Sequence, residues 1–251
     1  DEPFDPHQIT GEHISMKDTP EDEAIIGLLK DVETSTQAYL DQPIGTFDQA
    51  YKIEDGLAAR QFKHPLVTWI NHVQLRASGA DIALCGLGND VTGFNQAVKL
   101  SNILATYVYP NLLVVKELSG QTLKEALEKT AAFFTLKEGK IAVSEDFEHP
   151  KKEYYNYDMY DPITYTIDVR KPVGNRIQNL TFKGEKITPN DSFKVAMNNY
   201  RAAGGGDYAM IQKAPLIHDT QTEIVDLLIE AIAGKSGLTL DDPKNITIQG
   251  E

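Results

Sequence analysis

Residues 198–208 are Asn198-Asn199-Tyr200-Arg201-Ala202-Ala203-Gly204-Gly205-Gly206-Asp207-Tyr208, and they follow an apolar segment, Phe193 to Met197, that is typical of a β-strand. The order is a strand, a polar pair, an aromatic residue, three glycines and an acid. Glycine lets the backbone approach another group closely. The ring of Tyr200 offers a face on which a planar heterocycle can stack, and ionised Asp207 can accept hydrogen bonds from a ribose diol. The stretch predicts a ligand-binding turn; the alternative is a tight turn around a core tyrosine.

A second aromatic turn occurs much earlier in the chain, at Tyr107-Val108-Tyr109-Pro110-Asn111. Pro110 restricts the backbone of the turn. An exposed tyrosine beside an asparagine can stack on a base and hydrogen-bond its edge. The alternative interpretation is an ordinary entry into the strand that follows.

The pattern of apolar residues mixes helices and strands without a regular βαβ alternation. This predicts an α+β fold, with a mixed β-sheet and flanking helices. Thr19-Pro20-Glu21-Asp22 has the composition of a helix start, with Thr19 as the N-cap. The expected helices cover about residues 21–40, 65–78, 122–134 and 220–233, and the expected strands 80–84, 112–115, 163–167, 180–182 and 193–197.

Composition and charge restrict the partners. The chain has 251 residues with 37 acidic and 24 basic side chains, a formal net charge of -13. That field repels nucleic acid polymers and anionic membranes, and no apolar run reaches the ~18–20 residues that a membrane span needs. Cys85 lies in an apolar run, so we expect a buried, unreactive thiol. The charged start, Asp1-Glu2-Pro3-Phe4, does not resemble a signal peptide.

The sequence offers no recognisable metal site. None of the six histidines forms a close ligand pair such as HxH or HExxH. Asp5-Pro6-His7 has the Asp-x-His spacing of two-metal phosphoesterases, but no apolar strand precedes it. Gly88-Asn89-Asp90 begins like a Gly-Asn-His signature and lacks the histidine. We therefore expect no catalytic residue and no bound metal in this chain.

Several motifs in this order resemble the C-terminal domain of the 5′-nucleotidase family. The tyrosines at both stacking positions make it similar to the 2′,3′-cyclic-nucleotide 2′-phosphodiesterase branch of that family. The resemblance spans roughly residues 20–250. It is carried by five stretches: Leu66 to Leu84, Tyr109-Pro110-Asn111, Gly120 to Glu128, Tyr165 to Asp168, and Asn198 to Asp207.

The resemblance implies which residues contact the base and the ribose of a nucleotide. Tyr109 and Tyr200 would sandwich the base, Asn111 would hydrogen-bond the base edge, and Asp207 would hold the ribose hydroxyls. Gly205 belongs to the glycine run that approaches the ligand.

The phosphate contact is a separate expectation. Asn89 and Asp90 lie on the turn where relatives often carry NxGGIR, whose arginine grips phosphate. That arginine is absent here, and Arg76 or Arg201 is the candidate substitute.

The resemblance also implies what surrounds the domain. Residues 1–18 would be a linker or the remnant of a missing N-terminal metallophosphoesterase domain, and residues 19–251 the substrate-binding domain, which begins with a connecting helix. The covalently linked N-terminal domain would hold two divalent metal ions and perform the hydrolysis. The whole protein would be secreted, cell-wall-attached or periplasmic, would act on a nucleotide or nucleoside substrate, and this part alone would hydrolyse nothing.

Two further hypotheses remain open at this point. One is a solute-binding module for nucleosides with no catalytic partner, which the upstream coding sequence would distinguish. The other is an independent hydrolase with Asp207 or Asp158 as the base, which requires a carboxylate of raised pKa in an apolar pocket.

Overall fold

The computed structural model describes residues 10–250. The chain divides into two units, residues 1–40 and 41–251. In the first unit, the helix expected near residue 21 is confirmed as α1, Glu23–Leu40. Its start differs from the prediction, because Oδ1 of Asp22, and not Thr19, accepts hydrogen bonds from the first backbone N–H groups, at 2.9 and 3.2 Å. No residue of α1 is buried. Residues 1–9, which include the Asp5-Pro6-His7 triplet and half of the expected linker, lie outside the described residues.

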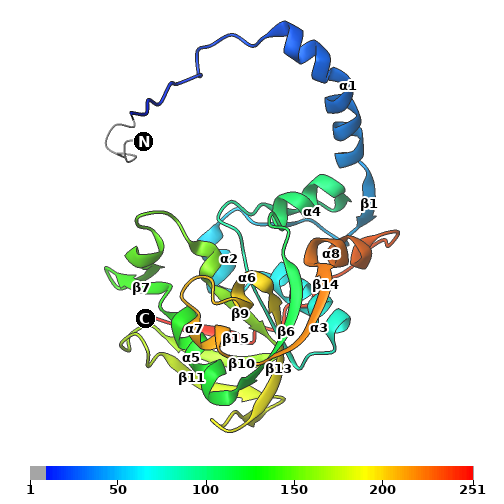
Figure 1. Ribbon diagram of the computed structural model, residues 1–251. Coiled ribbons are helices and arrows are strands. Elements are labelled where there is room, and N and C mark those ends of the chain that lie inside the picture. The colour runs from blue at the N-terminus through cyan, green and yellow to red at the C-terminus, as the bar shows by residue number, and fades with distance from the viewer. Residues whose placement is uncertain (1–9, 251) are drawn as a thin grey trace, which may run out of the picture. The chain divides into compact units, whose positions relative to one another are not determined.

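The second unit is built on a mixed five-stranded sheet with the strand order β14-β6-β13-β3-β9. Figure 1 labels β6, β9, β13 and β14 of this sheet. Strand β3 runs parallel to β13, and every other neighbouring pair is antiparallel. The strands are β3 (Ile82–Gly86), β6 (Leu112–Ser119), β9 (Asp158–Asp161), β13 (Ser192–Asn198) and β14 (Leu216–Glu223).

A second mixed sheet has the order β12-β11-β10-β15, in which β10 and β15 are parallel. Its strands are β10 (Ile163–Asp168), β11 (Ile177–Phe182), β12 (Glu185–Lys186) and β15 (Ile246–Gln249). Three short antiparallel pairs complete the strands. They are β1 (Pro43–Thr46) with β5 (Ala97–Lys99), β2 (Tyr51–Lys52) with β4 (Gly93–Phe94), and β7 (Phe134–Lys137) with β8 (Lys140–Val143).

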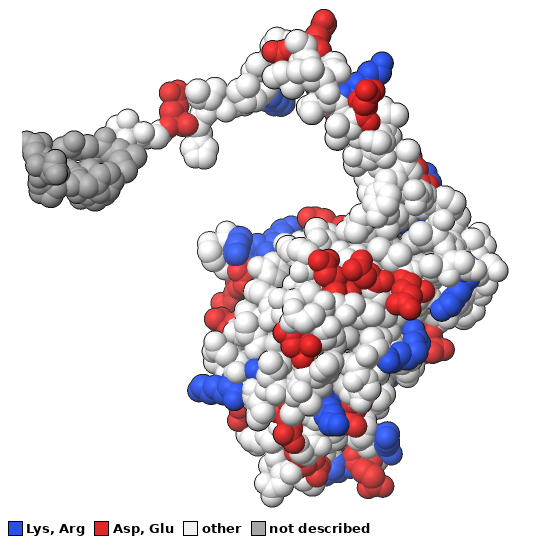
Figure 2. Space-filling view, turned by 45° about the vertical axis from the view of Figure 1, so that its right-hand side comes forward, with Lys and Arg blue, Asp and Glu red and all other residues white. Residues whose placement is uncertain are grey.

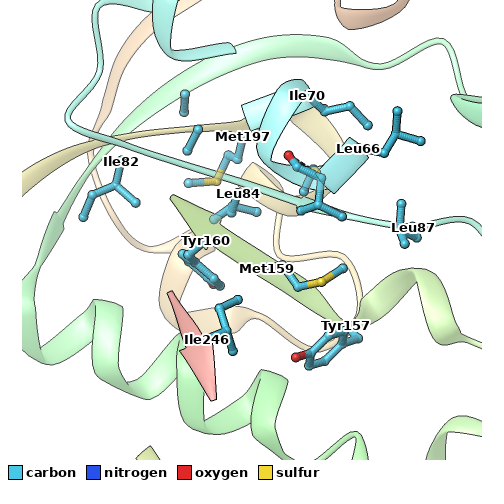
Figure 3. Close-up of a cluster of buried hydrophobic side chains, with 14 of the residues drawn as sticks. Leu66, Ile70, Ile82, Leu84, Leu87, Tyr157, Met159, Tyr160, Met197 and Ile246 are labelled. Carbon is cyan, nitrogen blue, oxygen red and sulfur yellow. Dashed lines mark hydrogen bonds between the residues drawn. The ribbon is translucent and has the colours of Figure 1, made fainter. Parts of the chain in front are cut away.

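Helix α3, Pro65–Ser78, covers one face of the five-stranded sheet. Pro65 occupies its first turn, and Gly79 ends it in the left-handed conformation, so the helix covers the expected residues 65–78. Leu66 and Ile70 of this helix lie near Leu84 of β3 in the core (Figure 3). The other helices of this unit are α2 (Gly56–Gln61), α4 (Leu100–Thr106), α5 (Gly120–Ala131), α6 (Asn199–Ala202), α7 (Ala209–Gln212) and α8 (Ile224–Ile232), with 3₁₀ turns at Glu145–Phe147 and Tyr154–Asn156.

Two expected helices are shorter than predicted. The last helix is expected from Thr220, but it begins at Ile224, because residues 220–223 belong to β14, which pairs with the edge of β6. The third helix ends at Ala131, and Phe134 begins β7 with a fully buried ring. In both places pairing with another strand overrides the local helical spacing.

Two expectations from composition concern single features. Cys85 is buried, as predicted, and burial raises the pKa of its thiol, so it stays protonated and unreactive. Within residues 10–250, no helix is long and apolar enough to cross a membrane. Figure 2 shows acidic and basic side chains interspersed over the visible face of the second unit, with several acidic groups gathered near its top.

Candidate functional site

The topology of the five-stranded sheet gathers several loop ends at one edge. Because β3 and β13 are parallel, their last residues, Gly86 and Asn198, lie at the same edge. The antiparallel neighbours begin there, since Asn198 pairs with Leu113 of β6 and Gly86 pairs with Asp158 of β9. The two aromatic turns found in the sequence, at 107–111 and 198–208, are therefore adjacent in space.

A pocket of about 210 Å³ opens at this edge. Tyr109 and Tyr200 both border it, and they are 54% and 41% exposed. Its volume is smaller than the roughly 300–1,000 Å³ of pockets that enclose a whole drug-sized ligand, so it suits one planar ring system. The full lining is Gly86, Gly88, Thr106, Tyr107, Val108, Tyr109, Asn111, Tyr155, Asn198 and Tyr200.

Tyr155 is a further aromatic residue of the pocket, beside Tyr107, Tyr109 and Tyr200, and the sequence did not predict its position there. Its ring centroid lies 6.3 Å from that of Tyr109 and 6.3 Å from that of Tyr200. The interplanar angles are 61° and 65°. The only signal in the sequence is the tyrosine-rich run 154–160, which does not indicate which ring faces a ligand.

Backbone contacts define the wall that carries Tyr109. The N–H of Asn111 donates to the carbonyl of Tyr109 at 2.8 Å, which closes the turn around Pro110. The side-chain oxygen of Asn199 accepts the N–H of Leu112 at 3.1 Å. The polar pair after β13 therefore ties this turn to the segment that carries Tyr200.

Asn198 and Gly205 position Tyr200. Asn198 caps the short helix α6 by accepting the N–H of Arg201 at 2.7 Å. A Cβ placed on Gly205 would lie 2.4 Å from the ring of Tyr200, so no larger residue fits beneath that ring. Gly205 is absent from the pocket lining, which indicates that its close approach is to Tyr200.

Arg201 lies in the interior and not in the pocket wall, which changes its expected role. It is 1% exposed, and its Nε donates to Oδ2 of Asp158 at 2.5 Å. Its Nη1 donates to the carbonyl of Gly205, and its Nη2 donates to Oδ1 of Asn156 at 3.3 Å. The structure thus assigns Arg201 to holding the 156–158 and 200–205 segments together, which corrects the expectation that it substitutes for a phosphate-binding arginine.

The position of Asp207 differs from the expectation for a ribose-binding residue. Its side chain is exposed and forms an ion pair with Lys129 of α5 at 3.3 Å. Asp207 is not among the residues that line the pocket. In this conformation it is therefore not placed to contact a ligand there.

Asn89 and Asp90 also lie outside the pocket lining. Asn89 uses its side chain to hold the loop that carries Tyr155: it donates to the carbonyl of Lys152 at 2.9 Å and accepts the N–H of Tyr154 at 3.1 Å. Asp90 is exposed. The geometry makes Asn89 a support for the pocket wall.

Arg60, a buried residue of α2, also connects the segment after β3 with the turn that carries Tyr155. Its Nη2 donates to the carbonyls of Leu87 and Gly88, at 2.7 and 2.9 Å, and its Nε donates to that of Tyr154 at 3.4 Å. Burial lowers the pKa of Arg60 to about 10, so the guanidinium is charged at neutral pH. Two buried arginines, Arg60 and Arg201, therefore hold together the segments that form the pocket wall.

Asp158, one candidate base of the independent-hydrolase hypothesis, is fully engaged. Burial raises its pKa, and the Arg201 guanidinium opposes that rise. Both of its carboxylate oxygens accept hydrogen bonds from Arg201. Asp158 does not line the pocket, so no proton of a ligand bound there is within its reach. Within residues 10–250, no group of three or more His, Cys, Asp or Glu side chains is placed to hold a metal ion.

Comparisons with known proteins agree on one family. The model of the family "5′-nucleotidase, C-terminal domain" matches residues 43–213. The 2′,3′-cyclic-nucleotide 2′-phosphodiesterase/3′-nucleotidase of Haemophilus influenzae is 30% identical over 86% of this chain and 38% of its own length. The protein of the same name from Salmonella typhimurium is 29% identical over 74% of this chain and 34% of its own length. The chain thus spans a little over a third of these relatives.

Solved structures give the same fold. The Staphylococcus aureus structure described as "Putative 5′-Nucleotidase", in complex with alpha-ketoglutarate, superposes with a TM-score of 0.85 at 33% identity, over 94% of this chain and 46% of that one. The 5′-nucleotidase precursor of Thermus thermophilus superposes with a TM-score of 0.71 at 20% identity, over 92% of this chain and 44% of that one, which supports the fold alone.

Proposed function

The chain belongs to the 5′-nucleotidase C-terminal domain family, and from this premise we propose that it is the nucleotide-recognising part of a two-metal nucleotide phosphoesterase. The proposed reaction class is that of a 2′,3′-cyclic-nucleotide 2′-phosphodiesterase and 3′- or 5′-nucleotidase. The proposed ligand of the pocket is the base of a nucleoside or nucleotide. One observation carries this proposal: two half-exposed tyrosines, from turns far apart in the sequence, border the same pocket.

The chemistry of the lining suits a neutral heterocycle. Tyr109 and Tyr200 offer ring faces for stacking, a contact worth about 1–3 kcal/mol per base. Asn111 offers a side-chain amide that can both donate to and accept from a base edge. Tyr107 lines the pocket beside these groups as a neutral phenol, and burial raises its pKa further.

The sugar and phosphate would lie toward the mouth of the pocket. Asp207 would contact the ribose only after breaking its exposed pair with Lys129, which is a small cost for a surface ion pair. Asn89 and Gly205 support the walls in this proposal, Asp90 is exposed outside the pocket lining, and no residue of the described chain is assigned to the phosphate.

Hydrolysis is assigned to a part of the protein outside this chain. Two divalent metal ions, bound by a covalently linked N-terminal metallophosphoesterase domain, would supply the activated water and the charge that stabilises the transferring phosphoryl group. The residues of this chain would bind and orient the nucleotide. Residues 1–18 would act as the linker, α1 as the connecting helix, and the complete protein would be secreted, cell-wall-attached or periplasmic.

Calorimetric titration of adenosine into the 251-residue chain tests the pocket. Tyr109→Ala and Tyr200→Ala are each expected to weaken binding by about 5- to 150-fold. Tyr39→Ala, on α1 and outside the pocket lining, is the matched control and is expected to change nothing. Absence of any binding by the unmodified chain at millimolar adenosine would contradict the proposal.

Two further measurements test the assignment of hydrolysis to another domain. The chain with added manganese is expected to leave 2′,3′-cyclic AMP and 3′-AMP intact, and turnover would overturn that assignment. An upstream coding sequence with Asp-x-His and Gly-Asn-His-Glu motifs is expected. Its absence would favour a solute-binding module for nucleosides.

A further inference from the structure

The ring of Tyr155 is inclined to the rings of both Tyr109 and Tyr200. Tyr155 lies at 61° to Tyr109 and at 65° to Tyr200, with both centroid separations equal to 6.3 Å. A base stacked parallel to the ring of Tyr109 or Tyr200 would therefore be inclined to the ring of Tyr155 and could not stack on it face to face. The three rings come from three separate segments: the turn before β6, the 3₁₀ turn Tyr154–Asn156, and α6.

The backbone around Tyr155 is held on both sides. Asn89 bonds the carbonyl of Lys152 and the N–H of Tyr154, and buried Arg60 bonds the carbonyl of Tyr154. On the other side, a Cβ on Gly86 would lie 2.5 Å from the carbonyl oxygen of Tyr155, so the strand end and this turn pack in direct contact. A side chain on such a support keeps its place when a ligand enters.

Its neighbour in sequence connects this turn to Tyr200. Oδ1 of Asn156 accepts a hydrogen bond from the Tyr200 hydroxyl at 3.5 Å and from Nη2 of Arg201 at 3.3 Å. The position of Tyr155 relative to the Tyr200 ring is therefore set by a direct polar link. Hydrogen bonds therefore hold the segment that carries Tyr155 against the segment that carries Tyr200.

From this geometry we infer that Tyr155 is a specificity-determining residue that makes the pocket prefer purine over pyrimidine nucleosides. The inference rests on the proposed function. Stacking on Tyr109 and Tyr200 uses the faces of a base, which every base has. Contact with Tyr155 uses an edge, and a two-ring purine extends farther toward it than a one-ring pyrimidine.

The test compares adenosine with cytidine by calorimetry on the 251-residue chain. Tyr155→Ala is expected to weaken adenosine binding about tenfold and cytidine binding less than twofold. Tyr155→Phe is expected to retain both affinities, because the ring and not the hydroxyl makes the contact. Tyr109→Ala and Tyr200→Ala are expected to weaken both nucleosides by similar factors.

The outcomes separate the two proposals. Equal loss for adenosine and cytidine in Tyr155→Ala, or an adenosine affinity that is unchanged or higher, overturns the role of Tyr155 and leaves the proposed function standing. Lack of adenosine binding by the unmodified chain overturns both. Should Tyr155→Ala fail to fold, as judged by circular dichroism, Tyr155→Leu replaces it, with the same expected loss of discrimination and the same overturning results.

Discussion

The tyrosines that border the pocket and those of the interior share one side-chain chemistry but differ in their exposure to solvent. Tyr155 borders the pocket, whereas Tyr157, two residues later, is 0% exposed and packs against Phe133. Tyr200 is half-exposed, whereas Tyr208 is fully buried. The comparison shows that availability to a ligand depends on where the backbone leaves the sheet edge, and not on the residue type.

One side chain joins the two sets of rings. The guanidinium of Arg201 lies 3.8 Å from the ring centroid of Tyr208 and 5.5 Å from that of Tyr200. Substitutions can therefore show whether the interior and the pocket respond separately or together.

The largest expected effect is alkaline destabilisation, to which the buried tyrosines of the interior contribute, together with Tyr107 and Tyr200 of the pocket, whose pKa values burial also raises. Burial raises the pKa of Tyr157, Tyr160, Tyr165 and Tyr208 above the unfolded value of about 10. A raised pKa stabilises the fold fully below pH 10, and this contribution is lost as the pH rises above 10, at about 1.4 kcal/mol per pH unit for each ring. Urea midpoints are expected to be flat from pH 7 to 9 and to fall steeply above pH 10. Tyr208→Phe should reduce the slope, and a midpoint that stays constant to pH 11 would contradict this account.

The next largest effect is expected for Arg201→Met, which removes the link between the two sets. It leaves the buried carboxylate of Asp158 without a partner, at a cost of about 3–5 kcal/mol in the free energy of unfolding. Urea denaturation measures this cost. Arg201→Met combined with Asp158→Asn should recover part of the loss, and a cost below about 1 kcal/mol for the single variant would show that the pair is not structurally important.

A smaller effect is expected from removing one interior hydroxyl. The hydroxyl of Tyr208 donates to the carbonyl of Asn156 at 3.0 Å and lies 2.6 Å from that of Thr130. Tyr208→Phe leaves both partners unsatisfied in the interior, so the free energy of unfolding should fall by about 1–2 kcal/mol. Tyr109→Phe, its counterpart on the exposed side, should change it by less than about 0.5 kcal/mol. Equal effects on stability would remove the distinction between the two sets.

The smallest expected effect is local to the pocket. In Gly205→Ala the new methyl group displaces the ring of Tyr200, so adenosine affinity should fall about fivefold, or about 1 kcal/mol. Calorimetry measures the affinity. Gly27→Ala, where a Cβ meets nothing within 4 Å, is the control. Unchanged affinity would mean that Gly205 does not set the position of Tyr200.

The sequence predicted the mixed sheet, helices α1 and α3 and the two aromatic turns, because each has a strong local signal, whereas it did not predict the short helix α2. Pro65 and Gly79 mark the ends of α3, and Pro110 marks the turn at Tyr109. It could not predict β14, because the strand conformation of residues 216–223 depends on an edge of β6 that is about a hundred residues away.

The site was less predictable than the fold, for the same reason. Arg201 has its ion-pair partner, Asp158, 43 residues away, and no spacing rule indicates that contact. The selection of Tyr155 from a run of tyrosines depends on the hydrogen bonds of Asn89 and Arg60. The roles of Tyr109, Asn111 and Tyr200 in binding remain predictions, which the nucleoside titrations test.

The last strands have a practical consequence for anyone who trims this chain. The family model ends at residue 213, yet β14 and β15 lie beyond it and pair with β6 and β10. A fragment cut at residue 213 would expose the backbone N–H and C=O groups of two strands, which are templates for pairing between molecules. A fragment that keeps both strands paired must therefore run through Gln249.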